Sequence, residues 1–187
     1  MPQQIIGLVG QLGSGKGVVT RYLAEAYDAQ TFKFSTYLSR ILDILGLDQS
    51  RDHLVKVSEA VREKFGEDIL SSAMAKDVTA STVALAVLDG LRRPEDLTML
   101  RDLPNFILVV VTATPEIRYQ RISARGEKTD EHHITWEEFL GQEQRSTELT
   151  IPATMKLASY TIENNGTEEE LCHAVDELMK TLHIPRL

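Results

Sequence analysis

Gly10-Gln11-Leu12-Gly13-Ser14-Gly15-Lys16-Gly17 is a glycine-rich segment with the spacing of one glycine, four residues and then Gly-Lys. We call residues 10–17 the phosphate loop. It follows the apolar run Ile5–Val9 and precedes a helical pattern that contains Val19 and Leu23. Glycines let backbone N–H groups turn toward phosphate oxygens, and the following helix adds its positive end. The segment therefore predicts binding of a nucleoside triphosphate. The alternative is a glycine-rich turn between a strand and a helix that binds no ligand.

The residue after Lys16 departs from the usual pattern. A Ser or Thr commonly stands there and gives its hydroxyl to magnesium, whereas this chain has Gly17 followed by Val18. Thr20 lies one turn too far along to be assumed a replacement. We therefore expect Gly10 to Val18 to bind ATP through backbone groups and Lys16, while Mg²⁺ is held by phosphates, water and other side chains.

Composition limits the class of protein. At 187 residues and 42% hydrophobic content the chain can bury one core, so residues 1–187 are predicted to form a single domain. A net charge of -8 disfavours a nucleic-acid partner, because such binding needs surplus Lys and Arg. No apolar run is long enough to span a membrane, and Cys172 is the single cysteine. We expect a soluble cytoplasmic protein with small-molecule partners; the oligomeric state is left open.

Strand and helix patterns alternate along the chain. Besides Ile5–Val9, four runs have strand character: Thr31–Phe34, Thr82–Leu88, Phe106–Ala113 and Tyr160–Glu163. The longer runs are continuously apolar, as in parallel strands covered by helices on both faces. The pattern predicts an α/β fold of the P-loop NTPase type, a three-layer α/β/α sandwich around a parallel sheet of about five strands. Its ligand site should lie at the carboxyl ends of the strands.

Three further helical patterns lie between or after these strands. A long one runs from Arg51 to Val78, with Leu54, Val57, Val61 and Phe65 on one face. Pro94 starts a short helix whose Leu97 and Leu100 should face inward. Thr167 and Glu170 form a capping box before the last helix.

Two groups follow the third predicted strand. Asp89 ends that strand, where P-loop proteins commonly place an acid that orients magnesium, so it is the predicted metal ligand; an Asp-Gly turn is the alternative. Arg92 comes next and can fork onto a phosphate of the acceptor, unless it is an ordinary solvated arginine. Residues 118–148 are charged and poor in aliphatic residues, which indicates a mobile segment.

Several motifs carry a family resemblance. Gly15-Lys16-Gly17 resembles adenylate kinase and its relatives. The stretches Asp89-Gly90-Leu91-Arg92, Thr112–Arg125 and Glu163–Leu171 resemble P-loop kinase-like proteins related to dephospho-CoA kinase and deoxynucleoside monophosphate kinases. The resemblance covers nearly the whole chain, and it implies a helical lid formed by residues 118–148.

The resemblance also implies roles for individual residues. Arg118, Arg121 and Arg125 have helical spacing and would project from the lid, Arg118 onto the donor and the other two onto the transferred phosphoryl group. A salt-bridged surface helix is the alternative reading. Asn165 and Gly166 would lie against the adenine, although a turn and helix cap explain them equally well.

The acceptor side is implied by Phe34-Ser35-Thr36-Tyr37-Leu38-Ser39-Arg40, which resembles the region after the second strand of nucleoside monophosphate kinases. Ser35 and Arg40 are its binding candidates, with Arg40 one position off the adenylate kinase spacing. Arg62 is a further candidate from the long helical region.

The sequence thus predicts an ATP-dependent phosphotransferase that uses Mg²⁺, with Lys16, Asp89, Arg121 and Arg125 as its catalytic residues. The favoured acceptor is a nucleoside or deoxynucleoside monophosphate. Dephospho-CoA is an alternative acceptor, but the stretch after the second strand lacks the acid that dephospho-CoA kinase has there. A non-catalytic nucleotide-binding regulatory module is the second alternative.

Overall fold

The structure is a computed structural model that describes residues 1–126 and 134–187, apart from the side chain of Arg125. His132 and His133, which the sequence places in the charged segment, lie outside the described residues.

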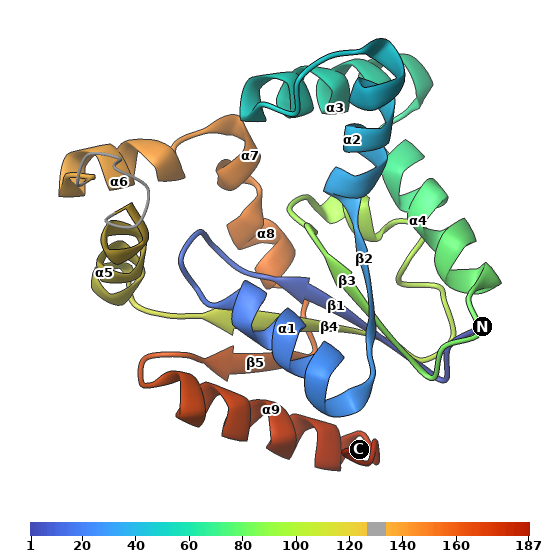
Figure 1. Cartoon of the computed structure of the whole chain (residues 1–187), viewed down its shortest axis with the longest axis vertical. Coiled ribbons are helices and arrows are strands. Elements are labelled where there is room, and N and C mark those ends of the chain that lie inside the picture. The colour runs from blue at the N-terminus through green and yellow to red at the C-terminus, as the bar shows by residue number, and fades with distance from the viewer. Residues whose placement is uncertain (127–133) are drawn as a thin grey trace.

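Five parallel strands form one sheet in the order β2-β3-β1-β4-β5, which confirms the predicted P-loop sandwich (Figure 1). Because all strands run the same way, their carboxyl ends share one edge, and the phosphate loop leaves the sheet at that edge from the central strand. The strands are β1 (Gln4–Val9), β2 (Gln30–Lys33), β3 (Leu85–Asp89), β4 (Phe106–Thr112) and β5 (Tyr160–Glu163).

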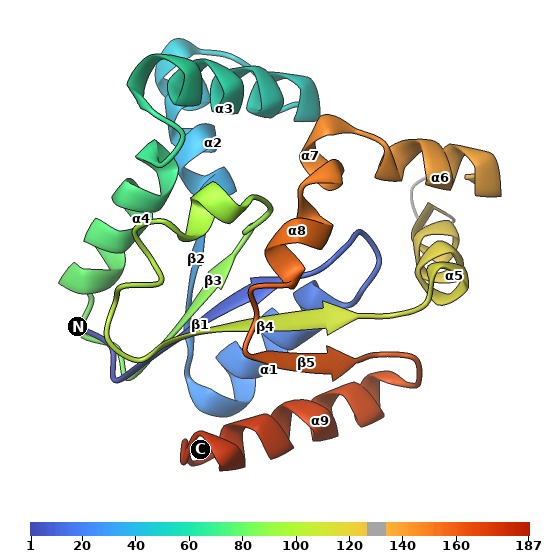
Figure 2. The same cartoon turned by 180° about the vertical axis from the view of Figure 1, so that it is seen from behind.

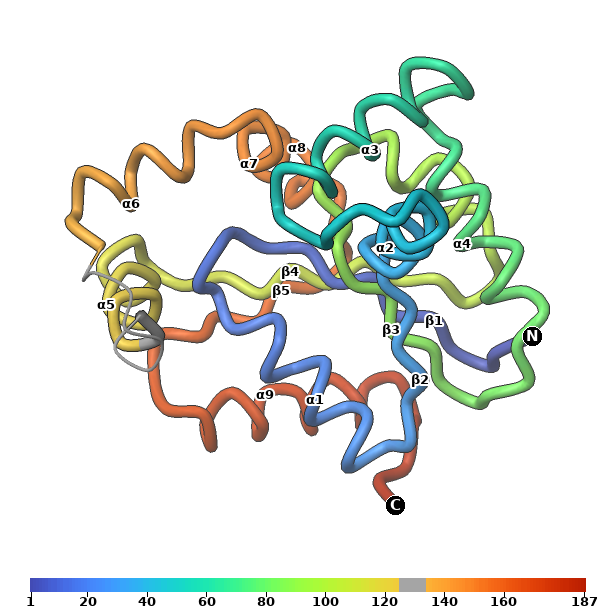
Figure 3. Tube along the Cα trace, turned by 45° about the horizontal axis from the view of Figure 1, so that its top comes forward, coloured from blue at the N-terminus to red at the C-terminus, as the bar shows by residue number. Residues whose placement is uncertain are grey.

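Helices cover both faces of the sheet (Figure 3). Side chains alternate along a strand, so Ile5 packs into the core on one face and Ile6 into the core on the other. The Ile6 face is covered by α1 (Lys16–Tyr27) and α9 (Glu168–Thr181). The Ile5 face is covered by α2 (Phe34–Leu45), α4 (Ile69–Ala80), the 3₁₀ helix η1 (Pro94–Leu97) and α8 (Ile151–Met155).

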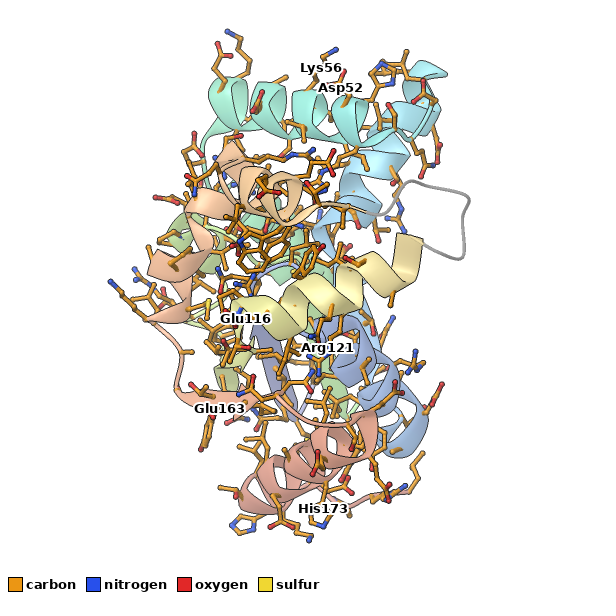
Figure 4. The ribbon with its side chains drawn as sticks, turned by 90° about the vertical axis from the view of Figure 1, so that its left-hand side faces the viewer. Asp52, Lys56, Glu116, Arg121, Glu163 and His173 are labelled. Carbon is orange, nitrogen blue, oxygen red and sulfur yellow. The ribbon has the colours of Figure 1, made fainter. Side chains whose placement is uncertain are left out.

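Four other helices lie beyond these two layers (Figure 2). α5 (Pro115–Gly126) follows β4, and α6 (Trp136–Glu143) and α7 (Ser146–Leu149) lead from it to α8 on the side of the sheet's carboxyl edge. α3 (Arg51–Phe65) lies at the end of the molecule farthest from α9. Its Asp52 and Lys56 pair on the outer surface, one turn apart, at an N–O distance of 2.7 Å (Figure 4).

The long helical stretch predicted from Arg51 to Val78 is two helices rather than one. Gly66 adopts φ 109°, a conformation that ends α3 and that other residues rarely adopt, and α4 begins at Ile69. Phe65 was expected on the buried face, but it is 72% exposed because it is the last residue of α3. Leu54, Val57 and Val61 pack against the core as predicted.

Smaller differences concern element ends. Phe34 begins α2 instead of ending the second strand, and β3 starts at Leu85, three residues later than predicted. The capping box of Thr167 and Glu170 and the inward positions of Leu97 and Leu100 are confirmed. Over the part of the chain that the structure describes, no helix is both long and apolar enough to cross a membrane.

Candidate functional site

A cavity of about 440 Å³ opens where the carboxyl ends of β1 and β3 meet the helices above them. One wall is the phosphate loop, and a second wall is the turn after β3 with Asp89 and Arg92. The rest is lined by the start of α2, the inner face of α3, and Thr147, Glu148 and Ile151 from α7 and α8. The cavity therefore joins the predicted donor-phosphate and acceptor residues in one space.

The shape of the phosphate loop depends on two of its glycines. Gly13 has φ 79° and Gly15 has φ 104°, in the left-handed region that favours glycine. A Cβ at Gly13 would lie 2.7 Å from the carbonyl oxygen of Arg118, and one at Gly15 would overlap the side-chain amide of Asn164. The backbone conformation that turns N–H groups toward phosphate is thus fixed by close neighbours.

Lys16 lies at the start of α1 and lines the cavity. Its Nζ donates hydrogen bonds to the carbonyl of Gly10 and, at 3.3 Å, to that of Gln11. Burial lowers the pKa of Lys16 to about 8, while the charge of Asp89 opposes this shift and that of Arg92 adds to it. Lys16, Asp89 and Arg92 therefore act on each other electrostatically in the cavity.

The residues present fit a magnesium ion held mostly by ligand phosphates and water. Thr20 cannot replace the missing hydroxyl, because it is buried and its Oγ1 donates to the carbonyl of Lys16 at 3.0 Å. Asp89 lines the cavity and supplies a hard oxygen ligand, and Mg²⁺ is commonly bound through one or two carboxylates plus substrate phosphates. Within residues 1–126 and 134–187, no group of three or more His, Cys, Asp or Glu forms a protein metal site.

The acceptor side contains a cluster of opposite charges. The Arg92 Nη1 atom donates to Glu148 Oε1, and Arg51 Nη2 lies 3.7 Å from the same oxygen. Glu148 is only 6% exposed, whereas the side chain of Arg92 is 43% exposed and faces the cavity. Ser35, another predicted acceptor residue, lines the same space from α2.

Asp96 fixes the wall that carries Arg92. Its carboxylate is buried and accepts hydrogen bonds from the backbone N–H groups of Arg92 at 2.8 Å and Arg93 at 3.0 Å. It also accepts from Arg62 Nη2 at 2.6 Å. Arg62 lines the cavity as predicted, but its guanidinium is held by Asp96 and by the carbonyl of Glu67.

Arg40 lies outside the phosphate-loop cavity. It borders a second hollow beside the edge strand β2, together with Lys33, Tyr37 and Asp77, and it is not among the residues that line the phosphate-loop cavity. The reason is geometric: Ser35 starts α2 at the cavity, and Arg40 is more than one turn farther along the helix.

The two predicted lid arginines whose side chains are described point in different directions. Arg118 is 2% exposed and faces back toward the phosphate loop, where its Nη1 donates to Glu143 Oε1 at 2.5 Å and to the carbonyl of Leu12 at 3.4 Å. Arg121 donates to the carbonyls of Asn164 at 2.9 Å and Gly166 at 3.0 Å. The side chain of Arg125 lies outside the described part.

The loop after β5 is tied to the phosphate loop by its first residue, Asn164. Its Nδ2 donates to the carbonyl of Ser14 at 2.9 Å, and its Oδ1 accepts from Arg121. The neighbouring Asn165, predicted to lie near adenine, accepts from the backbone N–H of Thr114 through Oδ1 at 2.9 Å.

Three acids at the site also escaped prediction: Asp96, Glu143 and Glu148. Glu143 Oε1 accepts from Gln11 Nε2 at 3.1 Å as well as from Arg118, so it links α6 to the phosphate loop. Each of these acids lies in a charged stretch of sequence where nothing sets it apart from its neighbours.

Known proteins resemble this chain over most of its length. The family model for the AAA domain (AAA_18) matches residues 6–150. A UPF0200 protein of Thermococcus kodakarensis is 28% identical over 187 residues, covering 95% of this chain and 100% of its own length. A UPF0200 protein of Sulfurisphaera tokodaii is 25% identical and covers 96% of this chain and 97% of its own length.

Solved structures share the fold at low identity. The structure of TT1252 from Thermus thermophilus superposes with a TM-score of 0.64 at 20% identity, covering 97% of this chain and 99% of that one. A sugar kinase from Janibacter sp. gives 0.57 at 14% identity, with 98% and 96% covered. Shikimate kinase from Acinetobacter baumannii, solved with shikimate, gives 0.52 at 20% identity, with 97% and 96% covered. The fold is that of P-loop kinases.

Proposed function

This chain belongs to the AAA domain family, and we propose that it is a kinase that transfers the terminal phosphoryl group of ATP to a nucleoside or deoxynucleoside monophosphate. One observation carries the proposal: a single cavity joins the phosphate loop and Lys16 to the arginines Arg51 and Arg92. Cations at both ends of one space suit a reaction between two phosphate-bearing molecules.

Each end of the cavity has a distinct task. The backbone N–H groups of the phosphate loop and the Lys16 ammonium would bind the donor phosphates, and Asp89 would hold magnesium, whose charge balances those phosphates when it is bound. Arg92 and Arg51 would orient the acceptor phosphate, with Ser35 beside it. A monophosphate is already ionised, so none of these residues needs to remove a proton before transfer.

Residues 118–148 remain our proposal for a lid, with Arg121 and Arg125 near the transferred group and Arg118, Asn165 and Gly166 on the nucleotide. The described part supports a link to both subsites: α6 contacts the phosphate loop through Glu143, and α7 contacts the acceptor arginines through Glu148. Movement of this segment would therefore change both ends of the cavity. We place the activity in the cytoplasm on sequence grounds alone.

A hydroxyl acceptor such as dephospho-CoA is a second candidate, and one observation favours it. The sequence showed no acid after the second strand, but Asp89 and Glu148 both line the cavity, and either carboxylate could take the proton of a hydroxyl. A regulatory module that only binds a nucleotide would have no use for the acceptor arginines.

The test is an ADP-release assay with Mg²⁺-ATP and a panel of nucleoside monophosphates, deoxynucleoside monophosphates and dephospho-CoA. Arg92→Ala should raise the KM for the acceptor about 10- to 150-fold, the worth of a charge-assisted hydrogen bond, and leave the KM for ATP nearly unchanged. Arg101→Ala, at an exposed arginine outside the cavity, is the matched control. Equal effects on both substrates would remove Arg92 from the acceptor site, and phosphorylation of dephospho-CoA alone would replace the proposed acceptor.

A further inference from the structure

We propose that Glu148 is a specificity-determining residue of the acceptor site, whose carboxylate accepts a hydrogen bond from a sugar hydroxyl of the acceptor. The inference rests on the proposed function, because it places the acceptor phosphate on Arg92, the residue that also holds Glu148.

Glu148 is a buried charge placed at the cavity by its neighbours. It belongs to the short helix α7 and is 6% exposed, yet it lines the cavity. Burying a carboxylate is costly unless it is paired, and Arg92 supplies the pair, with Arg51 farther away. The backbone of Arg92 is fixed in turn, since its N–H is held by Asp96 and its carbonyl accepts from Thr154 Oγ1 at 3.0 Å.

In their ion pair, Glu148 and Arg92 each keep the capacity for further hydrogen bonds. An ionised carboxylate has about four acceptor positions on its two oxygens. In the described part of the chain, the contacts of Glu148 with Arg92 and Arg51 both use Oε1, so Oε2 can accept from a ligand. Arg92 engages Glu148 and the carbonyl of Thr147 through Nη1 alone. A guanidinium has five N–H groups, so the others can donate to an anion in the cavity.

Electrostatics decides what kind of group meets Glu148. A phosphate oxygen would repel the carboxylate, so the group beside it must donate a hydrogen bond. It must also lie close to the acceptor anion, because the same guanidinium serves both. On a nucleoside monophosphate the sugar hydroxyls are the donors nearest to the phosphate, and the base lies beyond them. The apolar side chains of Leu38, Leu54 and Val55 also line the cavity and offer a surface for the base.

The expected selectivity follows from this pairing. A site built to accept a hydrogen bond from a substrate hydroxyl rejects an analogue that lacks it, because its own buried acceptor is then left unpaired. A charge-assisted bond of this kind corresponds to about a 10- to 150-fold difference in kcat/KM. The native protein should therefore prefer the parent nucleotide over one deoxy analogue by that factor.

The experiment compares kcat/KM for a ribonucleoside monophosphate and its 2′-deoxy and 3′-deoxy analogues in the native protein, E148Q, E148A and E59Q. Preference for the parent over one analogue should be largest in the native protein, smaller in E148Q, and close to 1 in E148A. Glu59 lines the same cavity but is exposed, so E59Q should keep the native preference. The two analogues distinguish the 2′-hydroxyl from the 3′-hydroxyl.

The outcomes separate the two proposals. The measurements on the native protein do not depend on whether the Glu148 variants fold. Equal use of the parent and both analogues by the native protein overturns the role of Glu148 and leaves the kinase proposal intact. A preference that persists in folded E148A overturns it as well. Absence of transfer to every monophosphate overturns the proposed function, and this inference with it.

Discussion

At the scale of single residues, the glycines of the phosphate loop have different reasons to be glycine. Gly13 and Gly15 adopt positive φ values and would bring a Cβ against neighbouring atoms. Gly17 has neither constraint, since among the described residues no heavy atom beyond its chain neighbours and the backbone of its own helix lies within 4 Å of the position of its Cβ. Its small size is therefore not demanded by packing, although the position is the one where P-loop proteins commonly carry a hydroxyl.

Gly17→Ser should be tolerated and should strengthen magnesium binding. The added hydroxyl has room and stands at the position that contacts the ion in related loops, so less Mg²⁺ should be needed for half-maximal activity. Replacing a helical glycine should also leave the melting temperature unchanged or slightly higher. Gly15→Ser is the contrasting variant, which should lower the melting temperature and abolish activity. An unchanged Mg²⁺ requirement in folded Gly17→Ser would show that the hydroxyl does not reach the ion.

Lys16 should give the reaction a pH limit on the alkaline side. Its pKa is lowered from 10.5 to about 8 by burial, so in the free protein the ammonium is lost as pH rises through about 8. The kcat/KM for ATP, which reports ionisations of the free enzyme, should fall above that pH. Lys16→Arg should be less active but lack this fall, because a guanidinium stays charged. The same fall in both proteins would assign it to another group.

Rising pH should change the stability of the protein in the opposite direction to its activity. Between about pH 8 and 10.5 the unfolded chain keeps the proton on Lys16 and the folded protein does not. The contribution of Lys16 to the free energy of unfolding therefore rises with pH across that window. Lys16→Ala should remove this slope in urea unfolding measured at several pH values, as well as abolish phosphotransfer while the fold remains intact.

At the scale of elements, α6 is attached to α5 by aromatic rings. Phe139 is fully buried, and its ring centroid lies 5.3 Å from that of Trp136 and 5.8 Å from that of Tyr119. The guanidinium carbon of Arg118 lies 5.4 Å from the same ring. Together with Glu143, these contacts dock α6 beside the phosphate loop.

Phe139→Ala should release α6 from this position. Loss of a buried aromatic side chain costs about 3–5 kcal/mol of stability, and here the loss should fall first on α6 because the ring joins it to α5. Hydrogen exchange in residues 136–143 should become faster while exchange in the central strands changes less. Leu140→Ala, at a side chain that is 41% exposed on the same helix, is the control. Unchanged exchange in α6 would mean that other contacts hold it.

At the scale of the whole molecule, Asp96 connects parts that the sheet does not hold together. α3 lies at the end of the molecule opposite α9 (Figure 1). The ion pair of Arg62 with Asp96 ties it to the turn after β3. Because the same carboxylate holds the backbone of Arg92 and Arg93, it links the position of α3 to the shape of the acceptor wall.

Asp96→Asn should destabilise the protein by about 3–5 kcal/mol, because it leaves the buried guanidinium of Arg62 without its charge partner. Urea unfolding measures this loss, and Asp102→Asn, at an exposed acid in the same region, should change stability little. In the fraction that remains folded, the KM for the acceptor should rise more than that for ATP. A small loss of stability with both KM values unchanged would show that α3 is held by other contacts.

Local sequence was sufficient for the fold and for locating the phosphate loop between β1 and α1. The glycine spacing of residues 10–17 has few other uses between a strand and a helix, and the apolar runs of buried parallel strands stand out from the rest of the chain. Asp89 and Arg92 could be placed because a strand end fixes where the next residues lie. Ser35, which was named through a family resemblance, lines the same cavity.

The charged network around that site was decided by tertiary structure alone. Arg92 and Glu148 are 56 residues apart, and Arg118 and Glu143 are 25 residues apart, so no local spacing joins them. In the sequence a buried acid such as Glu148 or Asp96 looks the same as a solvated one. Only the packing of the helices decides which acids are buried. Removing a charge from water is costly, so each buried acid must then pair with an arginine.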